Sequence, residues 1–454
     1  MTDDQLQTIS PIDGRYTEKT KHLREFFSES ALMRYRVLTE IKWLVFLSEN
    51  NDLKQIPELS SELKKQLNDI ISNFSINDAE SIKAIEKETN HDVKAVEYFL
   101  QEKLSNLSGG KNLIPFIHFG CTSEDINNIS YAMMLKDACD SRYKELNLLR
   151  DKLRDYSHQW ADDAMISRTH GQAASPTTMG KEFANFVSRL NQQIKTLENI
   201  EFRAKMNGAV GNFNAHQVAY PEIDWIDLSS SFIGSLELTN NSYTTQIEPH
   251  DWMAELFHVL IRINNICLDL SKDIWTYISM GYFKQTIRSS EVGSSTMPHK
   301  VNPIDFENAE GNLGLANSIL DHLASKLVIS RLQRDLSDST AQRNIGSAFA
   351  YISIAHQSLI KGLNKIKIDK EILNDDLDKN QELLAEAIQT ILRREQIEDA
   401  YEHLKKLTRG KSLDKETLIN FIDSLEISDS VKNELKELSP KNYIGVASKL
   451  AKKI

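Results

Sequence analysis

The sequence predicts an all-α protein, because residues that interrupt helices are scarce in it. Only 17 Gly and 9 Pro occur among its 454 residues. Four intervals of helical length contain neither residue, and they cover residues 121–170, 181–207, 250–280 and 315–345. A chain of this length exceeds one ordinary domain and can bury a large core. We therefore expect a core of long helices.

The spacing of apolar residues in the interval 250–280 favours a helix over a strand. Apolar side chains recur there every three or four residues, whereas a half-buried strand would alternate. If continuous, the 31 residues of the interval would reach about 46 Å at a rise of 1.5 Å per residue. The apolar positions are Trp252, Met253, Leu256, Phe257, Leu260, Ile263, Cys267 and Leu270.

The distribution of helix breakers and charge suggests three domains. Residues 1–120 combine shorter helices with several Gly and Pro breaks, and residues 121–345 hold the four long intervals. Residues 346–454 are rich in Lys, Glu, Asp, Asn and Leu, which is typical of helices with solvated faces. We predict an N-terminal helical domain, a central long-helix bundle and a C-terminal helical domain.

The charge balance argues against general binding to nucleic acids or membranes. The chain carries 54 basic and 65 acidic residues, a net charge of −11. Its three cysteines show no CxxC spacing and cannot all pair, which suggests a reducing, cytoplasmic compartment. The first residues, MTDDQLQ, do not resemble a signal peptide, and no apolar run approaches the length of a membrane span. We expect a soluble cytoplasmic protein.

Common cofactor and nucleophile motifs are missing from the sequence. It contains no GxxxxGK, GxGxxG, HExxH or GxSxG pattern. The sequence therefore lacks the usual motifs of four enzyme classes: those that use nucleoside triphosphates, those that use dinucleotides, zinc proteases and serine hydrolases. We expect neither a metal nor an organic cofactor, and any anionic ligand of this acidic chain needs a local basic pocket.

The segment 289–303, SSEVGSSTMPHKVNP, is the most informative about chemistry. It places adjacent hydroxyls, including Ser294 and Ser295, close to Lys300 and Asn302, so proton-transfer groups and anion-binding donors share one loop. Clusters of Gly, Ser and Pro more often mark only a turn. The order of the residues, considered below, favours a functional loop.

A second cluster, SRTHGQAASPTTMGKE at 167–182, contains His170. A single histidine is more often a structural residue than a functional one. Here Gly171, Pro176 and Gly180 follow closely, so the sequence predicts an exposed junction between helices at which His170 exchanges protons.

A third cluster, CTSEDINN at 121–128, opens the first long interval. Thr122 and Ser123 are natural N-cap residues, and Asp125 lies three residues after Thr122, so a capping box explains the pattern as well. The functional alternative is a helix N-terminus whose hydroxyl and amide groups bind a carboxylate or phosphate.

Three further segments carry cationic and polar side chains: PIDGRY, TNHDVKAVEY and SRLQRDLSDSTAQRNIG. Arginines on helices usually make surface ion pairs. A guanidinium also fits a phosphate well, and in an acidic chain the stretch from Arg334 to Arg343 is the best candidate for a phosphate clamp.

Together these segments resemble the fumarase/aspartase superfamily. The loop 289–303 matches every fixed position of the pattern G-S-S-x-M-P-x-K-x-N of that superfamily. Within it, the resemblance is closest to the bacterial adenylosuccinate lyases, and it extends from about Ser10 to Gly445. It is carried by SPIDGRY, TNHDVKAVEY, HFGCTSEDINN, SRTHGQ, NGAVGNFNAH, GSSTMPHKVNPIDFEN, RLQRDLSDST and NYIG.

The resemblance implies the anti β-elimination of fumarate from a succinylamino nucleotide, with Ser294 as the base that removes the Cβ proton and His170 as the acid. The substrates would be adenylosuccinate, giving AMP, and succinylaminoimidazole carboxamide ribotide, giving aminoimidazole carboxamide ribotide. The nucleotide phosphate would be bound by Arg15, Tyr16, Arg334, Ser339 and Arg343. The succinyl carboxylates or neighbouring groups would be bound by Asn90, Thr122, Ser123, Gln246, Ser295, Lys300 and Asn302, with His91, Asp92, Asn308 and Thr340 as further substrate-binding residues.

The resemblance also implies a homotetramer in which the central helices form a shared helical core and each active site combines three subunits. His91 is a rival for the acid, since the neighbouring Asp92 would fix its tautomer and raise its basicity. Two other functions remain open: a cycloisomerase of the same superfamily that acts on carboxymuconate, and a catalytically silent structural or binding homologue.

Overall fold

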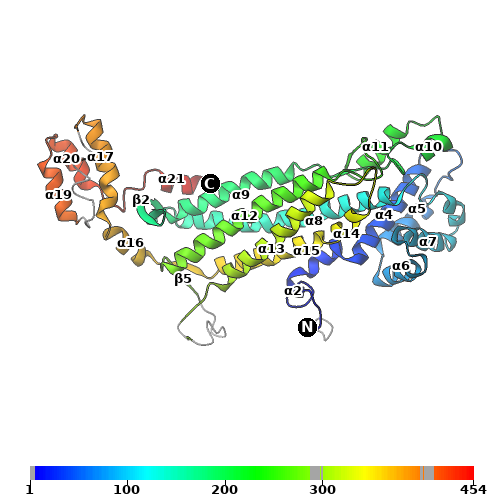
Figure 1. Ribbon diagram of the computed structural model, residues 1–454, viewed down its shortest axis with the longest axis horizontal. Coiled ribbons are helices and arrows are strands. Elements are labelled where there is room, and N and C mark those ends of the chain that lie inside the picture. Colours follow the sequence, from blue (N-terminus) through cyan, green and yellow to red (C-terminus); the bar gives the residue numbers. More distant parts are fainter. Residues whose placement is uncertain (1–5, 287–296, 298–299, 399–401, 403–413) are drawn as a thin grey trace. The chain divides into compact units, whose positions relative to one another are not determined.

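Helices make up most of the protein, and its strands are short (Figure 1). The computed structural model describes residues 6–286, 297, 300–398, 402 and 414–454. The all-α prediction is confirmed. Within the described part of the chain, no helix is both long and apolar enough to cross a membrane.

The N-terminal part of the chain folds into helices that pack around α4 (Glu29–Ser48). Ser28 caps α4, because its hydroxyl accepts a hydrogen bond from the amide of Ala31 at 3.1 Å. Ser75 and Asp78 form a capping box at α6. The other elements here are α2 (Thr17–Thr20), η1 (Lys21–Leu23), α3 (Arg24–Phe27), α5 (Ser61–Ser72), α6 (Ile76–Thr89), α7 (Asp92–Ser105) and η2 (Gly110–Phe116).

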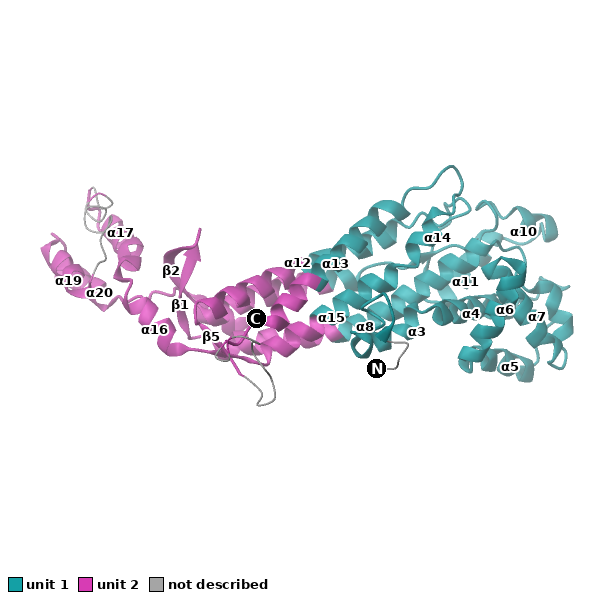
Figure 2. Ribbon diagram, turned by 60° about the horizontal axis from the view of Figure 1, so that its bottom comes forward, with its two compact units in different colours: residues 1–144, 195–264, 312–355 teal, residues 145–194, 265–311, 356–454 magenta. Residues whose placement is uncertain are grey.

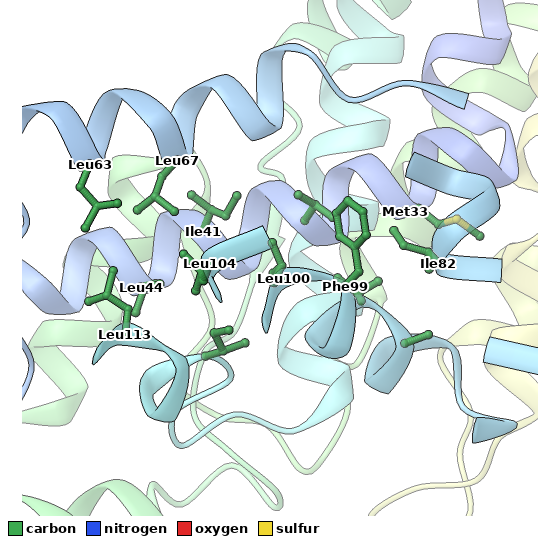
Figure 3. Close-up of a cluster of buried hydrophobic side chains, with 14 of the residues drawn as sticks. Met33, Ile41, Leu44, Leu63, Leu67, Ile82, Phe99, Leu100, Leu104 and Leu113 are labelled. Atoms are coloured by element: carbon green, nitrogen blue, oxygen red, sulfur yellow. The ribbon is translucent and has the colours of Figure 1, made fainter. Parts of the chain in front are cut away.

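An apolar cluster joins these helices (Figure 3). Side chains from α4, α5, α6, α7 and η2 meet in it, and each is almost fully buried. Burial of one such side chain stabilises the fold by about 1.5 to 3 kcal/mol. The members labelled in Figure 3 are Met33, Ile41, Leu44, Leu63, Leu67, Ile82, Phe99, Leu100, Leu104 and Leu113.

Long helices follow in the middle of the chain. The apolar positions that predicted a helix at 250–280 are all buried along one of them, α12, which is 29 residues long. That prediction is confirmed. The long helices are α8 (Ser123–Gln159), α9 (Met179–Glu198), α12 (Asp251–Ser279), α13 (Ile304–Leu327) and α15 (Ile345–Leu363), and shorter ones are α10 (Asn214–Ala219), α11 (Trp225–Ser235) and α14 (Ser337–Gln342).

Three of the predicted long helices end earlier than the spacing of breakers suggested, and one of them, α9, stops at Glu198 although its interval extends to residue 207. Helix α8 stops at Gln159, because the carbonyl of Trp160 accepts the amide of Gly180 at 2.9 Å and the chain then forms a strand. In the interval 315–345, helix α13 stops at Leu327. There the carboxylate of Asp335 accepts the backbone amides of Arg331 and Ser337 and so competes with helical hydrogen bonds.

Among the residues that the structure describes, the strands form three two-stranded sheets. The largest is the antiparallel hairpin of β1 (Ala164–Thr169) and β2 (Gln172–Thr178), whose register shifts between Ile166 and Ser167. The others are the parallel pair β3 (Arg203–Ala204) and β4 (Thr239–Asn240) and the antiparallel pair β5 (Phe283–Gln285) and β6 (Ile366–Ile368).

The C-terminal part contains short helices with a small core of its own. Leu384, Ile388, Leu418 and Leu435 are buried in that core. The helices are α16 (Lys370–Asp378), η3 (Gln381–Leu384), α17 (Ala385–Arg394), α19 (Lys415–Ser424), α20 (Asp429–Glu437) and α21 (Ala447–Lys453).

The chain divides into two compact units, each built from three segments (Figure 2). The first unit comprises residues 1–144, 195–264 and 312–355, and the second comprises 145–194, 265–311 and 356–454. This division follows spatial contacts rather than chain order, and the three-domain organisation stays a prediction.

Candidate active site

Helix α8 begins at Ser123, where the sequence placed a helix N-terminus. The backbone amide of Thr122 donates to the carboxylate of Asp125 at 2.7 Å, which is one half of the predicted capping box. Asp125 does more than cap the helix, because it is fully buried and paired with Lys205 at 2.9 Å. The side chains of Thr122 and Ser123 are half-buried.

The arginine block 331–343 reaches the start of α8 through Arg334. Its guanidinium donates to the carboxylate of Glu124 at 2.9 Å, and it is 16% exposed. Burial raises the pKa of Glu124, against the opposing charges of His250 and Arg334. Ser339 and Thr340 lie on α14, where Ser339 is half-buried and Thr340 is exposed.

Arg343 connects the same block to the segment that contains Asn90, His91 and Asp92. One terminal nitrogen of Arg343 lies 3.2 Å from Asp92, and the other lies 2.6 Å from Glu29. Asp92 also accepts a hydrogen bond from Arg36 at 2.7 Å. Burial opposes the charge of Asp92, but the charge and hydrogen bond of Arg36 outweigh it and lower the pKa of the carboxyl.

His91 does not pair with Asp92, so the sequence-based reason for its raised basicity is wrong. Its Nδ1 accepts the backbone amide of Lys94 at 3.1 Å, which makes His91 the N-cap of α7. In the neutral ring the proton therefore lies on Nε2. Asn90 precedes it with a left-handed backbone (φ 52°) and ends α6, a conformation that Asn tolerates better than most residues.

Two more of the predicted substrate-binding segments lie in the first unit. Arg15 is exposed, and its guanidinium carbon lies 5.8 Å from the centre of the Tyr16 ring. The side-chain amide of Gln246 donates to the carbonyl of Ala209 at 3.0 Å.

His170 belongs to the second unit and lies in the turn of the β1–β2 hairpin. Its backbone and that of Gly171 are both left-handed, with φ values of 55° and 75°, as a two-residue type I′ turn requires. The sequence predicted a junction between helices here, and a hairpin takes its place. The exposure predicted for His170 is confirmed.

The described residues of the loop 289–303, which are 297 and 300–303, belong to the second unit. Ser294 and Ser295 lie outside the described residues. Lys300 is exposed and Asn302 is half-buried, just before α13. On α13, the side-chain oxygen of Asn308 accepts the hydroxyl of Ser358 at 2.7 Å.

The structure thus connects three of the predicted blocks directly. Arg334 joins the block 331–343 to the start of α8, and Arg343 joins it to the segment that contains Asp92. Two charged residues of this region, Arg36 and Lys205, were missed. Each is buried in an ion pair. Each also follows an arginine by two positions, Arg34 and Arg203 respectively, so no local pattern set them apart.

Comparison with known proteins gives the family. A family model described as "Lyase" matches residues 14–316, and one described as "Adenylosuccinate lyase C-terminal" matches residues 330–444. An adenylosuccinate lyase of Legionella pneumophila subsp. pneumophila is 54% identical over 100% of this chain and 99% of its own length. One of Escherichia coli K12 is 51% identical over 97% of both chains.

The chain belongs to the adenylosuccinate lyase family. It is therefore a lyase of the fumarase/aspartase superfamily, and the resemblance of its sequence motifs is confirmed.

Solved structures of more distant proteins share the fold. A fumarate lyase from Mesorhizobium sp. BNC1 aligns with a TM-score of 0.76 at 17% identity, covering 95% of this chain and 97% of that one. A 3-carboxy-cis,cis-muconate lactonizing enzyme from Pseudomonas putida aligns with a TM-score of 0.74 at 18% identity, covering 95% and 96%. At such identities the likeness concerns the fold alone.

Proposed function

We propose that the chain eliminates fumarate from adenylosuccinate, giving AMP, and from succinylaminoimidazole carboxamide ribotide, giving aminoimidazole carboxamide ribotide. Both substrates carry a succinylamino group and a ribose phosphate, so one set of contacts can serve both. The two reactions would place the enzyme in purine biosynthesis and in the cytoplasm. Membership of the adenylosuccinate lyase family supports this function.

The observation that carries the proposal is the direct linkage of segments far apart in the sequence. Within the first unit, Arg334 and Arg343 connect α14 and its flanks to Glu124 at the start of α8 and to Asp92 at the start of α7. The chain thereby gathers hydroxyl, amide and guanidinium donors, as a dianionic phosphate and two carboxylates require.

The guanidinium groups of Arg334 and Arg343 remain suited to phosphate although each contacts carboxylates. A guanidinium has five N–H donors, and the observed bonds hold the fork in a fixed orientation. The side chain of Arg343 is 38% exposed, so it can approach a ligand. We propose that both bind the nucleotide phosphate, together with Arg15, Tyr16 and Ser339.

The proposed chemistry starts at the Cβ of the succinyl group. In its ionised form Ser294 removes the Cβ proton and becomes a neutral hydroxyl, and the electrons of the C–H bond move into the adjacent carboxylate. The C–N bond then breaks as His170 protonates the leaving nitrogen. Lys300 and Asn302 stabilise the extra negative charge of the intermediate carboxylate. The exposure of His170 in the hairpin turn supports its role, because the ring is open to substrate.

We further propose a homotetramer whose active sites combine residues of three subunits. Support comes from large apolar side chains that are exposed in the single chain: Trp275 on α12 is 44% exposed, Leu315 on α13 is 51% exposed, and Leu332 is 88% exposed. A long-helix bundle shared between subunits would bury such groups. If activity persists after dilution has produced monomers, shared sites are ruled out.

The test of the function is fumarate release by the purified protein from each substrate. The Ser294→Ala variant should lose about 10²- to 10⁴-fold in kcat, the usual contribution of one acid–base group. A carboxymuconate substrate serves as the control for the cycloisomerase alternative and should yield no lactone. If the wild-type protein releases no fumarate from either nucleotide, the proposal fails and the silent homologue gains support.

A second comparison assigns the acid. We expect His170→Ala to abolish single-turnover chemistry and His91→Ala mainly to raise KM, because the Nδ1 of His91 is engaged as the cap of α7. The reverse result would make His91 the acid.

A further inference from the structure

A fully buried ion pair lies directly behind the proposed succinyl-binding residues Thr122 and Ser123. The Nζ of Lys205 is 2.9 Å from Oδ1 of Asp125, and both side chains are 0% exposed. Asp125 belongs to the first turn of α8, whereas Lys205 follows strand β3. The pair therefore joins two segments that lie far apart in the sequence.

The carboxylate of Asp125 also orders the backbone of both segments that the ion pair connects, a connection called here the joint. Its Oδ2 accepts the amide of Thr122 at 2.7 Å, and its Oδ1 accepts the amide of Asn207 at 3.0 Å. The amide of Gly208 lies within 3.3 Å of both oxygens. Hydrogen bonds to an ionised acceptor are about twice as strong as neutral ones, so one side chain fixes the start of α8 against residues 207 and 208.

Two hydrogen bonds between the side chain of Asn128 and the backbone of Lys205 fix the alignment of the two segments at the joint. The side-chain oxygen of Asn128 accepts the amide of Lys205 at 2.8 Å, and its nitrogen donates to the carbonyl of Lys205 at 3.1 Å. Asn128 lies one turn after Asp125 on the same face of α8. The segment from Lys205 to Gly211, called here the 205–211 segment, thus runs along α8 in one register.

The 205–211 segment is also hydrogen-bonded to the segment that contains Gln246, another proposed succinyl-binding residue. Asn207 donates to the hydroxyl of Thr244 at 2.8 Å, and Gln246 donates to the carbonyl of Ala209 at 3.0 Å. At Gly211 the two segments come so close that an added Cβ would lie 2.4 Å from the carbonyl oxygen of Thr244. Only glycine permits this approach.

Apolar packing would not explain why charges occupy this joint. Replacing a buried ion pair with apolar residues of similar volume is often neutral or stabilising. What a carboxylate offers, and an apolar side chain does not, is simultaneous acceptance of amides from two segments.

We propose that Asp125 and Lys205 are positioning residues, which hold Thr122, Ser123 and Gln246 in the arrangement that binds the succinyl carboxylates. This role rests on the proposed function. Asp125 and Lys205 touch no substrate themselves and act through the backbone of the 205–211 segment.

The test compares Asp125→Asn, Lys205→Met and the double variant. In Asp125→Asn, the new NH₂ group faces the amides of Thr122 or Gly208 and cannot accept their hydrogen bonds. We expect KM for adenylosuccinate and the inhibition constant of fumarate to rise about tenfold or more, as small misplacements of a site do. The inhibition constant of AMP, bound mainly through its phosphate, should change less than about twofold, since a phosphate contact is not altered.

The double variant separates positioning from stability. With both charges removed, its thermal midpoint should recover towards that of the wild-type protein, because no unpaired buried charge remains. KM should stay raised, because the Asp125→Asn substitution still leaves one side of the joint without an acceptor. If KM for adenylosuccinate returned to its wild-type value together with the thermal midpoint, the role of the pair would be merely structural. The same would follow if the inhibition constants of fumarate and AMP rose equally.

Should the Asp125 variants fail to fold, a milder pair of substitutions tests the same connection. Thr244→Val removes the hydroxyl that accepts from Asn207, whereas Thr244→Ser keeps it. We expect the valine variant to raise KM and the fumarate constant, and the serine variant to restore both. Unchanged constants in Thr244→Val overturn the inference, whereas a wild-type protein that releases no fumarate instead refutes the proposed function.

Discussion

Substitution of Gly120 by alanine should destabilise the protein through a single side-chain overlap. Gly120 precedes the start of α8 and has a left-handed backbone with φ +73°. An added Cβ would lie 2.3 Å from Nε2 and 2.5 Å from Cδ2 of His216. His216 cannot easily move away, since it is 0% exposed and its ring centre lies 4.7 Å from that of Trp225.

Two effects add to give the expected magnitude. A left-handed conformation costs a residue with a Cβ about 1 to 2 kcal/mol. Overpacking of a closed site adds about 1 to 3 kcal/mol. Gly109→Ala is the matched control, because Gly109 has φ +81° but an added Cβ would meet only Leu63, at an ordinary 3.8 Å. We expect Gly109→Ala to show the backbone effect alone.

Thermal midpoints at one protein concentration give the comparison, because assembly alters apparent stability. A double-mutant comparison tests whether the two side chains overlap. Gly120→Ala should lower the thermal midpoint less when His216 is replaced by the smaller serine than it does in the wild-type protein. Equal losses for Gly120→Ala and Gly109→Ala, or additive effects of Gly120→Ala and His216→Ser, would refute the overlap as the cause.

Three predictions concern charged groups. Burial lowers the pKa of His118, but the hydrogen bond to Glu40 at 2.6 Å and the charges of Glu40, Glu97 and Asp125 together raise it above 6.5. The pair should therefore stabilise the fold fully below that pH and less as pH rises through the folded-state pKa, so His118→Gln should flatten the decline of the thermal midpoint from pH 6.5 upward. Asp92→Asn should lower the free energy of opening by about 3 kcal/mol, and by more than Arg36→Met does, because it leaves the 2% exposed guanidinium of Arg36 without its carboxylate. Hydrogen exchange of the amides in α4 and α7 measures both losses, and equal losses would contradict this. Burial and the charge of a neighbouring carboxylate raise the pKa of Asp273 to about 6, so the ionised side chain destabilises the fold above that pH. Asp273→Asn should therefore raise the thermal midpoint of unfolding at about pH 8 but not at about pH 4.

The fold was predictable where one periodic signal decided the structure. In α12, the three- and four-residue spacing of apolar side chains correctly identified the buried face. Between Gln159 and Met179 the breakers Gly171 and Pro176 did indicate an interruption, which was interpreted as a junction between helices. The hairpin there depends on a turn at His170 and Gly171 and on pairing between strands, and a breaker does not show whether helices or strands flank it.

The site was predictable in its residue types and less so in its contacts. Hydroxyls at Thr122 and Ser123 do mark a helix start. The carboxylates that accept hydrogen bonds from Arg334 and Arg343 lie at least 210 positions away in the sequence, a separation that local spacing cannot indicate. For the same reason, adjacency in sequence wrongly paired His91 with Asp92.

The placement of buried charge indicates how this chain separates stability from positioning. The cluster in Figure 3 joins five helical elements with apolar side chains alone. Two ion pairs with fully or largely buried members instead lie where proposed binding segments begin, Asp125 with Lys205 and Arg36 with Asp92. Desolvating an ion costs several kcal/mol, so such pairs are a poor means of strengthening a core. Such pairs can fix geometry, because a carboxylate accepts hydrogen bonds from several groups at defined angles, whereas apolar contacts tolerate small shifts. We therefore expect substitutions in the apolar cluster to lower stability and substrate affinity together, and substitutions at these ion pairs to lower affinity beyond what the loss of stability explains.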